Sequence, residues 1–445
     1  MPFHLRSWTC TTPDQPWRSL DPADSAPPVN SDTLSTLRIT EDRHQAVLGF
    51  GGCFNELGWH ALRQAKAAQR DALLDELFTD DGCAFSFCRV PIGANDYALS
   101  WYDHAPTPGD FALRDFNIER DERHLLPYLD AARQRRPDLC LFASPWSPPV
   151  WMKTHAAYNH GRLKNEDQTL AAYARYFQKF VETYRQRGVN VSQVHVQNEP
   201  GSDQKFPSCV MPATQMRDFI RDHLGPVFQA DQSDCEVWAG TFEKGVTHGW
   251  DFHEELTYPH LAHAVLKDPA ARRYVDGVGL QWDGKGLIES LHRAFPELPI
   301  IQTENECGDG QNTWPYAFYV FSLACHYFNH GAVAYTYWNM ALPQGGQSTW
   351  GWRQNAMASV HPDGSIVRNP EFYVMKHLAH FVRPGSRRRG LVGSWCPFAL
   401  AFDTPQNETV AIIANPYDAP EPLALDNAPR LTLPPRSLST FTFGT

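Results

Sequence analysis

Short hydrophobic runs alternate along residues 45–383 with longer stretches in which apolar residues recur at the spacing of a helix. Runs with the length and β-branched character of buried strands occur eight times, at 47–54, 84–91, 139–144, 189–197, 235–240, 275–282, 299–303 and 332–338. Stretches with apolar residues at helical spacing follow them in turn, at 61–78, 117–135, 170–184, 213–228, 259–271, 286–295, 314–329 and 370–382. This alternation predicts parallel strands joined by helical crossovers.

Eight strand–helix units predict an α/β fold, a closed (β/α)8 TIM barrel over residues 45–383. A doubly wound open sheet is the alternative. Its first unit would carry a glycine-rich phosphate loop, but Gly49-Phe50-Gly51-Gly52 has the wrong spacing for a dinucleotide fingerprint. The pattern therefore favours the barrel.

The two ends of the chain have a different texture. Residues 1–44 are rich in Pro, Asp, Ser and Thr, with one alternating piece at 33–40. Residues 384–445 carry short β runs at 398–402, 409–413, 431–433 and 439–443. Four strands are few for a sandwich, so we expect the N-terminal arm to complete an all-β sandwich built from both termini. The basic run Arg387-Arg388-Arg389 is expected to be a solvated turn.

Composition excludes several classes of protein. Hydrophobic residues make up 42% of the chain and charged residues 20%, as in globular proteins. The net charge of −11 argues against nucleic-acid binding, which requires a basic face. No apolar run approaches the ~20 residues of a membrane span, and the N-terminus lacks the apolar core of a signal peptide. We therefore expect a cytoplasmic protein.

Cysteine and histidine spacing predicts no metal site. The ten cysteines lack CxxC spacing and lie mostly in apolar elements, so buried free thiols are expected. His195, His326 and His330 lie on apolar strands or helices and are interpreted as core or surface residues. The sequence His253-Glu254-Glu255 lacks the second histidine of a zinc helix.

Polar and aromatic residues gather where the predicted strands end, which is the edge that carries the chemistry in a TIM barrel. The strand at 189–197 runs into Asn198-Glu199-Pro200, and proline cannot continue a sheet ladder. The strand at 299–303 runs into Glu304. The other strand ends carry Glu56, Arg89, Asp96, Trp146, Trp282, Asp283, Trp338 and Asn339.

Two carboxyl groups at two strand ends are what cleavage of a glycosidic bond requires. One protonates the leaving oxygen, and the other attacks or stabilises the anomeric carbon. Partial desolvation at the sheet edge favours the neutral, proton-donating form of Glu199. If Arg89 lies in a cluster of acids, its positive charge would keep one carboxylate ionised. Structural roles are the alternative: a capping carboxylate for Glu199, an ion pair for Arg89, and rim packing for Trp146 and Trp338.

Six runs resemble a known family when taken in order. They are GFGGCFNE (49–56), FCRVPIGANDYALS (87–100), ASPWSPPVWMKT (143–154), VQNEP (196–200), IIQTENECGDG (300–310) and YWNMALPQGGQSTWGW (337–352). Together they resemble glycoside hydrolase family 30, the glucosylceramidase-like retaining β-glycosidases. The resemblance implies a TIM barrel with a β-sandwich made from both chain ends.

The resemblance also implies roles for single residues. Glu199 matches the general acid/base and Glu304 the nucleophile, with Glu306 a near neighbour that could be mistaken for it. Arg89 matches the arginine beside the nucleophile. The residues expected to bind the sugar are Asp96, Trp146, Asn198, Trp282 and Trp338. The implied reaction needs no metal or organic cofactor.

The implied function is hydrolysis of β-glucosides or β-linked gluco-oligosaccharides by double displacement, with carboxyl groups roughly 5–5.5 Å apart. Gln281-Trp282-Asp283 departs from the His-Trp-Tyr run of animal-type glucosylceramidases, which argues against ceramide as leaving group. β-Xylosidase and β-1,6-glucanase activities are alternatives. A non-catalytic carbohydrate-binding barrel is another, and would have carboxyl groups more than about 10 Å apart. A metal-dependent hydrolase lacks the necessary histidines.

Overall fold

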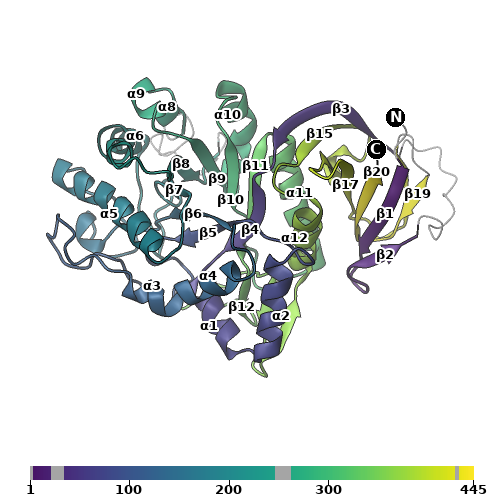
Figure 1. The fold of residues 1–445 in the computed structure, drawn as a ribbon, viewed down its shortest axis with the longest axis horizontal. Coiled ribbons are helices and arrows are strands. Elements are labelled where there is room, and N and C mark those ends of the chain that lie inside the picture. Colours follow the sequence, from purple (N-terminus) through teal and green to yellow (C-terminus); the bar gives the residue numbers. More distant parts are fainter. Residues whose placement is uncertain (1–3, 22–34, 246–261, 426–429, 445) are drawn as a thin grey trace.

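A closed parallel barrel of eight strands lies beside a nine-stranded sheet in the computed structural model, which describes residues 4–21, 35–245, 262–425 and 430–444 (Figure 1). The barrel strands are β4 (Gly49–Cys53), β5 (Phe87–Pro91), β6 (Cys140–Ser144), β7 (Gln193–His195), β8 (Glu236–Phe242), β9 (Gly277–Gln281), β10 (Ile300–Glu304) and β11 (Ala332–Asn339). The barrel closes where β11 pairs with β4 in parallel. The predicted TIM barrel is confirmed.

Helices surround the barrel and bury their apolar faces against it. They are α1 (Glu56–Gln64), α2 (Ala67–Phe78), α3 (Glu119–His124), α4 (Leu126–Arg133), α5 (Asp167–Gln186), α6 (Ala213–Phe219), α7 (Gly225–Ala230), α8 (Ala262–Leu266), α9 (Pro269–Arg272), α10 (Ile288–Ala294), α11 (Trp314–Asn329) and α12 (Pro370–Phe381). Residues 259–261 of one predicted helix lie outside the described residues. No described helix combines the length and apolar character needed to cross a membrane.

Three predicted helices are each divided in two, because apolar spacing does not register a break in the backbone. Within the described residues, the helix expected at 259–271 forms α8 and α9. The helix expected at 61–78 is interrupted at Ala65, where the backbone is extended. The helix expected at 117–135 is interrupted at Leu125, and Pro127 occupies the first turn of α4, where a missing N–H is tolerated. The strand expected at 189–197 is paired only over β7.

The nine-stranded sheet combines both ends of the chain. Its strand order is β19 (Leu431–Leu433), β18 (Glu421–Leu425), β3 (Thr36–Ala46), β15 (Arg387–Val392), β16 (Ala399–Asp403), β17 (Glu408–Asn415), β20 (Ser437–Gly444), β1 (His4–Thr11) and β2 (Arg18–Leu20). One apolar core takes Leu433 from one end of this order and Trp8 from the other, so the sheet folds over itself. In Figure 1 it lies to one side of the barrel.

The run Arg387-Arg388-Arg389 is not a solvated turn, so that prediction is wrong. It begins β15, which pairs with β3 and β16. Arg389 is 4% exposed and donates to Asp403 at 2.9 Å and to the Thr40 carbonyl. Partners on adjacent strands thus satisfy a guanidinium that sequence alone assigned to solvent.

The sheet domain packs tightly on the barrel. His377 of α12 is buried and lies within hydrogen-bond distance of both Thr11 in β1 and Thr440 in β20. Phe402 of β16 packs edge-on against Phe328 of α11. All ten cysteines are free and eight are buried, as their spacing predicted.

Candidate active site

A cavity of about 520 Å³ contains five of the predicted site residues, and most of these come from the strand ends. Asp96, Trp146, Glu199, Trp282 and Glu304 line it. The other three predicted residues lie behind this lining: Arg89, Asn198 and Trp338 are almost completely buried. The carboxyl edge of the barrel therefore brings all eight residues into one site, as expected for parallel strands.

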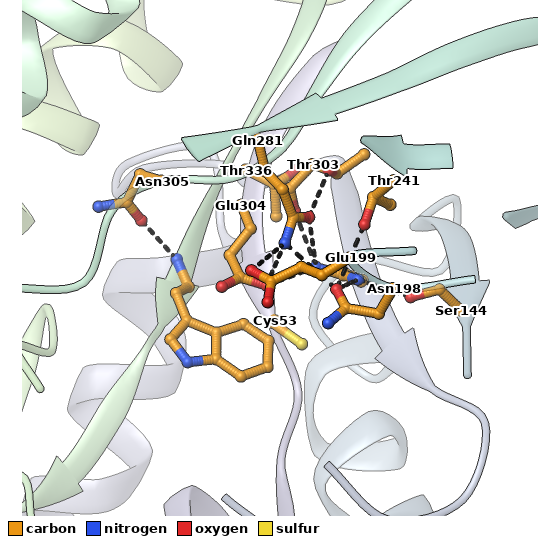
Figure 2. Close-up of polar contacts among 12 residues, drawn as sticks. Cys53, Ser144, Asn198, Glu199, Thr241, Gln281, Thr303, Glu304, Asn305 and Thr336 are labelled. Atoms are coloured by element: carbon orange, nitrogen blue, oxygen red, sulfur yellow. Dashed lines mark hydrogen bonds and ion pairs between the residues drawn. The ribbon is translucent and has the colours of Figure 1, made fainter. Parts of the chain in front are cut away.

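The carboxyl groups of Glu199 and Glu304 meet at a single amide (Figure 2). The Nε2 group of Gln281 donates to Glu199 Oε1 at 3.0 Å and to Glu304 Oε2 at 3.4 Å. Added together, these distances limit the separation of the two oxygens to 6.4 Å. This limit is below the roughly 6.5–9.5 Å of inverting glycosidases and accommodates the roughly 5–5.5 Å of retaining ones.

Arg89 organises the floor of the site. It is fully buried and donates to Glu304 Oε2 at 2.8 Å, to Asn198 Oδ1 at 2.7 Å and to Ser144 Oγ at 2.6 Å. Its guanidinium carbon lies 4.3 Å from the ring centre of Trp146, a cation–π distance. One arginine from β5 therefore fixes a carboxylate from β10 and an amide that follows β7.

Asn198 has its carbonyl oxygen fully engaged by the protein. That oxygen accepts from Arg89, from Thr241 Oγ1 at 3.2 Å and from Gln281 Nε2 at 3.2 Å. Arginine is only a donor, so the oxygen must face it. The Nδ2 group of Asn198 is then the part that can donate to a substrate hydroxyl.

Burial raises the pKa of both carboxyl groups. The pKa of Glu304 is raised to about 8 by burial, against the opposing charge of Arg89, and the pKa of Glu199 is likewise raised by burial. Two carboxyl groups this close resist simultaneous ionisation. Arg89, Gln281 and Trp282 all donate hydrogen bonds to the Glu304 carboxyl group, whereas within the described part of the chain Gln281 is the one side chain that donates to the Glu199 carboxyl group, so the shared charge belongs on Glu304.

The backbone at two of these positions is strained. Glu199 has a φ of +48° and Trp282 a φ of +46°, in the left-handed region that non-glycine residues seldom adopt. The Glu199 N–H donates to the Thr241 carbonyl at 3.1 Å, which holds this conformation. Such strain is found at functional sites, where it aims a side chain.

Asp96 and the stacked pair Trp146 and Trp338 form another part of the site. Asp96 Oδ2 accepts from Gln354 Nε2 at 3.3 Å, while Oδ1 is buried and lacks a hydrogen-bond partner among the described residues. Trp146 and Trp338 stack with centroids 5.3 Å apart. Burial raises the pKa of Asp96 to about 7. A sugar hydroxyl would satisfy the unpaired oxygen of Asp96.

Two strand-end acids have other roles. Glu56 is an ion-pair partner of Arg120 at 2.7 Å and is absent from the cavity lining. Glu306 does line the cavity, but Lys285 contacts it at 2.7 Å and Tyr319 donates to it at 2.6 Å. These contacts favour Glu304 over Glu306 as the reactive carboxylate. His195, buried between Phe142 and Trp238, is a core residue, as predicted.

Several cavity residues were missed by the sequence analysis. Gln281, which ends β9 and contacts both carboxyl groups from outside the cavity lining, was noted in the sequence within Gln281-Trp282-Asp283 but was given no role in the site. Glu243 and Lys244 were missed because their strand was predicted to stop at 240, whereas β8 runs to Phe242. The others lie on loops after β7 and β12 (Ala341–Pro343), where no periodicity predicts the path of the chain. They are Ser202, Gln204, Lys205, Phe206, Trp350, Trp352 and Gln354.

Three of these loop residues form what we call the aromatic rim: Phe206, Trp350 and Trp352. Trp350 and Trp352 stack with centroids 5.4 Å apart, and Phe206 lies 5.2 Å from Trp350. Lys205 Nζ lies 5.2 Å from the Trp350 ring centre. Since Trp352 is 40% exposed, this rim faces the mouth of the cavity.

Comparisons with known proteins agree with this geometry. Residues 47–382 match the family model "Glycosyl hydrolase family 30 TIM-barrel domain". The chain is 28% identical over 417 residues to lysosomal acid glucosylceramidase of Mus musculus, covering 87% of this chain and 78% of the mouse protein. It is also 28% identical over 283 residues to an endo-1,6-β-D-glucanase of Neurospora crassa, covering 61% of this chain and 56% of the fungal protein.

Two solved structures share the whole fold. SrfJ from Salmonella typhimurium superposes with a TM-score of 0.87 at 22% identity, over 100% of both chains. The endo-β1,6-glucanase BT3312 superposes with a TM-score of 0.85 at 22% identity, over 99% of both chains. With the family match covering most of the sequence, the chain belongs to glycosyl hydrolase family 30 and is a glycoside hydrolase.

Proposed function

We propose that this enzyme is a retaining β-glucosidase that removes glucose from a hydrophilic leaving group, such as the next sugar of a short β-linked gluco-oligosaccharide. Glu199 acts as the acid/base and Glu304 as the nucleophile. The observation that carries the proposal is the shared contact of both carboxyl groups with Gln281 Nε2, which keeps the two contacting oxygens within 6.4 Å of each other and so accommodates the roughly 5–5.5 Å of retaining enzymes. A non-catalytic barrel would have no need of this pairing.

The first step transfers the glycosyl group to Glu304. A carboxylate oxygen of Glu304 attacks the anomeric carbon while the bond to the leaving oxygen breaks, and that oxygen takes the proton of Glu199. Arg89 holds Glu304 at 2.8 Å, which keeps its charge on the attacking group. Asn198 Nδ2 is placed to donate to the sugar 2-hydroxyl, a contact that strengthens in the transition state.

The second step releases the sugar. Glu199, now ionised, takes a proton from a water molecule whose oxygen attacks the anomeric carbon. The ester bond breaks and its electron pair returns to Glu304. Two inversions at one carbon leave the product in the β configuration.

The leaving-group side of the cavity is polar, which supports a sugar over a lipid. The acid must reach the glycosidic oxygen, so the residues around Glu199 face the leaving group. Ser202 donates to Glu243 at 2.7 Å there, and Lys205 and the aromatic rim lie beyond. Aromatic faces with charged and hydroxyl neighbours fit a sugar ring, whereas ceramide chains require a continuous apolar wall.

The test compares leaving groups and sugars on the purified enzyme. The substrates are gentiobiose, cellobiose, glucosylceramide in detergent micelles, and aryl β-D-glucoside, xyloside, galactoside and fucoside, with the first product anomer observed by proton NMR. Gentiobiose is included because two of the similar proteins are named 1,6-glucanases. We expect β-glucose as the first product and kcat/KM at least about tenfold higher for a disaccharide than for glucosylceramide.

Three results would contradict the proposal. Release of α-glucose first would exclude the retaining mechanism. A higher kcat/KM for glucosylceramide than for either disaccharide would make ceramide the leaving group. A faster rate on the xyloside than on the glucoside would identify a β-xylosidase.

A further inference from the structure

Gln281 lies at the centre of the polar network in Figure 2, although it is neither an acid nor a base. It is fully buried at the end of β9. Its amide is in hydrogen-bond contact with both carboxyl groups of the pair and with Asn198. Neither step proposed above assigns it a role.

The orientation of this amide is determined by its neighbours. Its oxygen accepts from Thr303 Oγ1 at 2.9 Å and lies 3.4 Å from an Arg89 nitrogen. Arg89 can only donate, so the amide oxygen faces it and Nε2 faces the carboxyl groups. Flipping the amide would place an oxygen against two acids and a donor against a cation.

We propose that Gln281 is a positioning residue that stabilises the single negative charge of the catalytic pair in both steps of the reaction. This inference rests on the proposed roles of Glu199 and Glu304. The contacts of the amide oxygen with Thr303 and Arg89 hold the side chain in place. The Nε2 group donates to both carboxyl groups and stabilises their charge.

The negative charge of the pair moves from Glu304 to Glu199 during the reaction, and Gln281 Nε2 contacts both carboxyl groups. Before glycosyl transfer the anion is Glu304, with Nε2 3.4 Å away. After transfer Glu304 is a neutral ester and the anion is Glu199, with Nε2 3.0 Å away. Among the described residues Arg89 donates a hydrogen bond to Glu304 but none to Glu199, so the Gln281 amide is the donor that serves both stages.

Other ionisable groups also influence the ionisation of Glu199 and Glu304. All of them are still present when Gln281 is substituted. Arg89 and Lys244 each contribute a positive charge, while nearby acids oppose ionisation. Buried thiols also face the site from the ends of β4 and β10. The acids and thiols are Asp96, Glu243, Asp283, Glu306, Cys53 and Cys307.

Removing the Gln281 donor should raise the pKa values of the two carboxyl groups. A hydrogen bond to a carboxylate lowers its pKa, so its loss raises the pKa values of the pair. The singly ionised, active form then appears only at higher pH, and the second ionisation is also delayed. Both limbs of the pH–rate profile of Gln281→Met should move to higher pH, by about one pH unit for one charged hydrogen bond.

The experiment uses the full chain with Gln281→Met, which keeps the side-chain length and removes the donor. We expect kcat/KM on an aryl β-glucoside to fall about 10- to 100-fold in Gln281→Met. Stopped-flow measurements with a dinitrophenyl glucoside separate the release of phenol from the later steady state. Both rates should fall, because the amide serves both anions.

Gln302→Met is the matched control, since Gln302 is a buried glutamine of the adjacent strand β10 that donates to neither acid and accepts from the Thr336 N–H. It should leave both pH limbs in place. Wild-type limbs in a folded Gln281→Met, or the same shift in Gln302→Met, would overturn the inference. Failure of the proposed function is distinguishable, because Glu304→Gly would then remain active.

Discussion

The floor of the cavity and its aromatic rim are built in different ways. On the floor, Arg89 is fully buried and donates to Glu304, Asn198 and Ser144. At the rim, Trp352 is 40% exposed, and its ring stacks on Trp350 and lies near Lys205. The floor is connected by charged hydrogen bonds and the rim by ring surfaces.

This difference separates chemistry from selection of the leaving group. A change on the floor alters groups that contact the reacting atoms, so it should lower kcat for every substrate. A change at the rim removes surface that contacts only a leaving group long enough to reach it, so it should raise KM for some substrates. Single substitutions on the floor and at the rim should therefore affect different kinetic constants.

The largest effect is expected for Glu304→Gly. Without the nucleophile no glycosyl ester can form, so kcat should fall by about 10⁴-fold or more on all substrates. Azide, which can enter the vacated space, should restore part of the activity and yield an α-glycosyl azide, identified by NMR. Substantial unassisted activity in this variant would place the nucleophile elsewhere.

A smaller, substrate-dependent loss is expected for Glu199→Gln. A leaving group that needs protonation should lose about 10²- to 10⁴-fold in rate, whereas a dinitrophenyl glucoside, which leaves without a proton, should retain its first step. The measurement is kcat/KM across aryl glucosides of graded leaving-group acidity. A uniform loss over that series would show that Glu199 is not the acid.

The sequence alone predicted the floor well, because the floor is made of strand ends. The carboxyl ends of parallel strands share one edge, so identifying the strands that precede Glu199 and Glu304 was enough to bring them together. Gln281 was passed over because an amide has no evident chemistry until its neighbours are known. Glu243 was not identified as a site residue because the strand before it was predicted to end at residue 240, whereas β8 ends at Phe242.

The rim and the sheet domain depend on contacts that no local pattern contains. Lys205 and Trp352 lie on separate loops whose paths are set by tertiary packing. Arg389 was assigned to solvent on charge alone, yet its partners Asp403 and the Thr40 carbonyl lie on other strands of the same sheet. Periodicity finds elements, whereas long-range pairing determines which polar residues are buried.

The pH–rate profile tests the shared charge on the floor. Below the first ionisation of the pair Glu304 is protonated and cannot attack, so activity falls with falling pH. Above the second, Glu199 has lost the proton it must donate, so activity falls with rising pH. Because burial raises the pKa of both groups, the alkaline limb of kcat/KM should lie at higher pH than the titration of a solvent-exposed glutamate. It should disappear in Glu199→Gln assayed with a dinitrophenyl glucoside.

The smallest effect is expected at the rim, from Trp352→Ala. Loss of one stacked ring should raise KM for disaccharides by about three- to tenfold and leave kcat for a simple aryl glucoside unchanged. Tyr417→Ala is the matched control, because Tyr417 is a 49% exposed aromatic residue outside the cavity lining, and it should change neither constant. A fall in kcat for the aryl glucoside in Trp352→Ala would show that rim and floor are coupled. Loop residues would then help to position the nucleophile, and the separation of chemistry from leaving-group selection would fail.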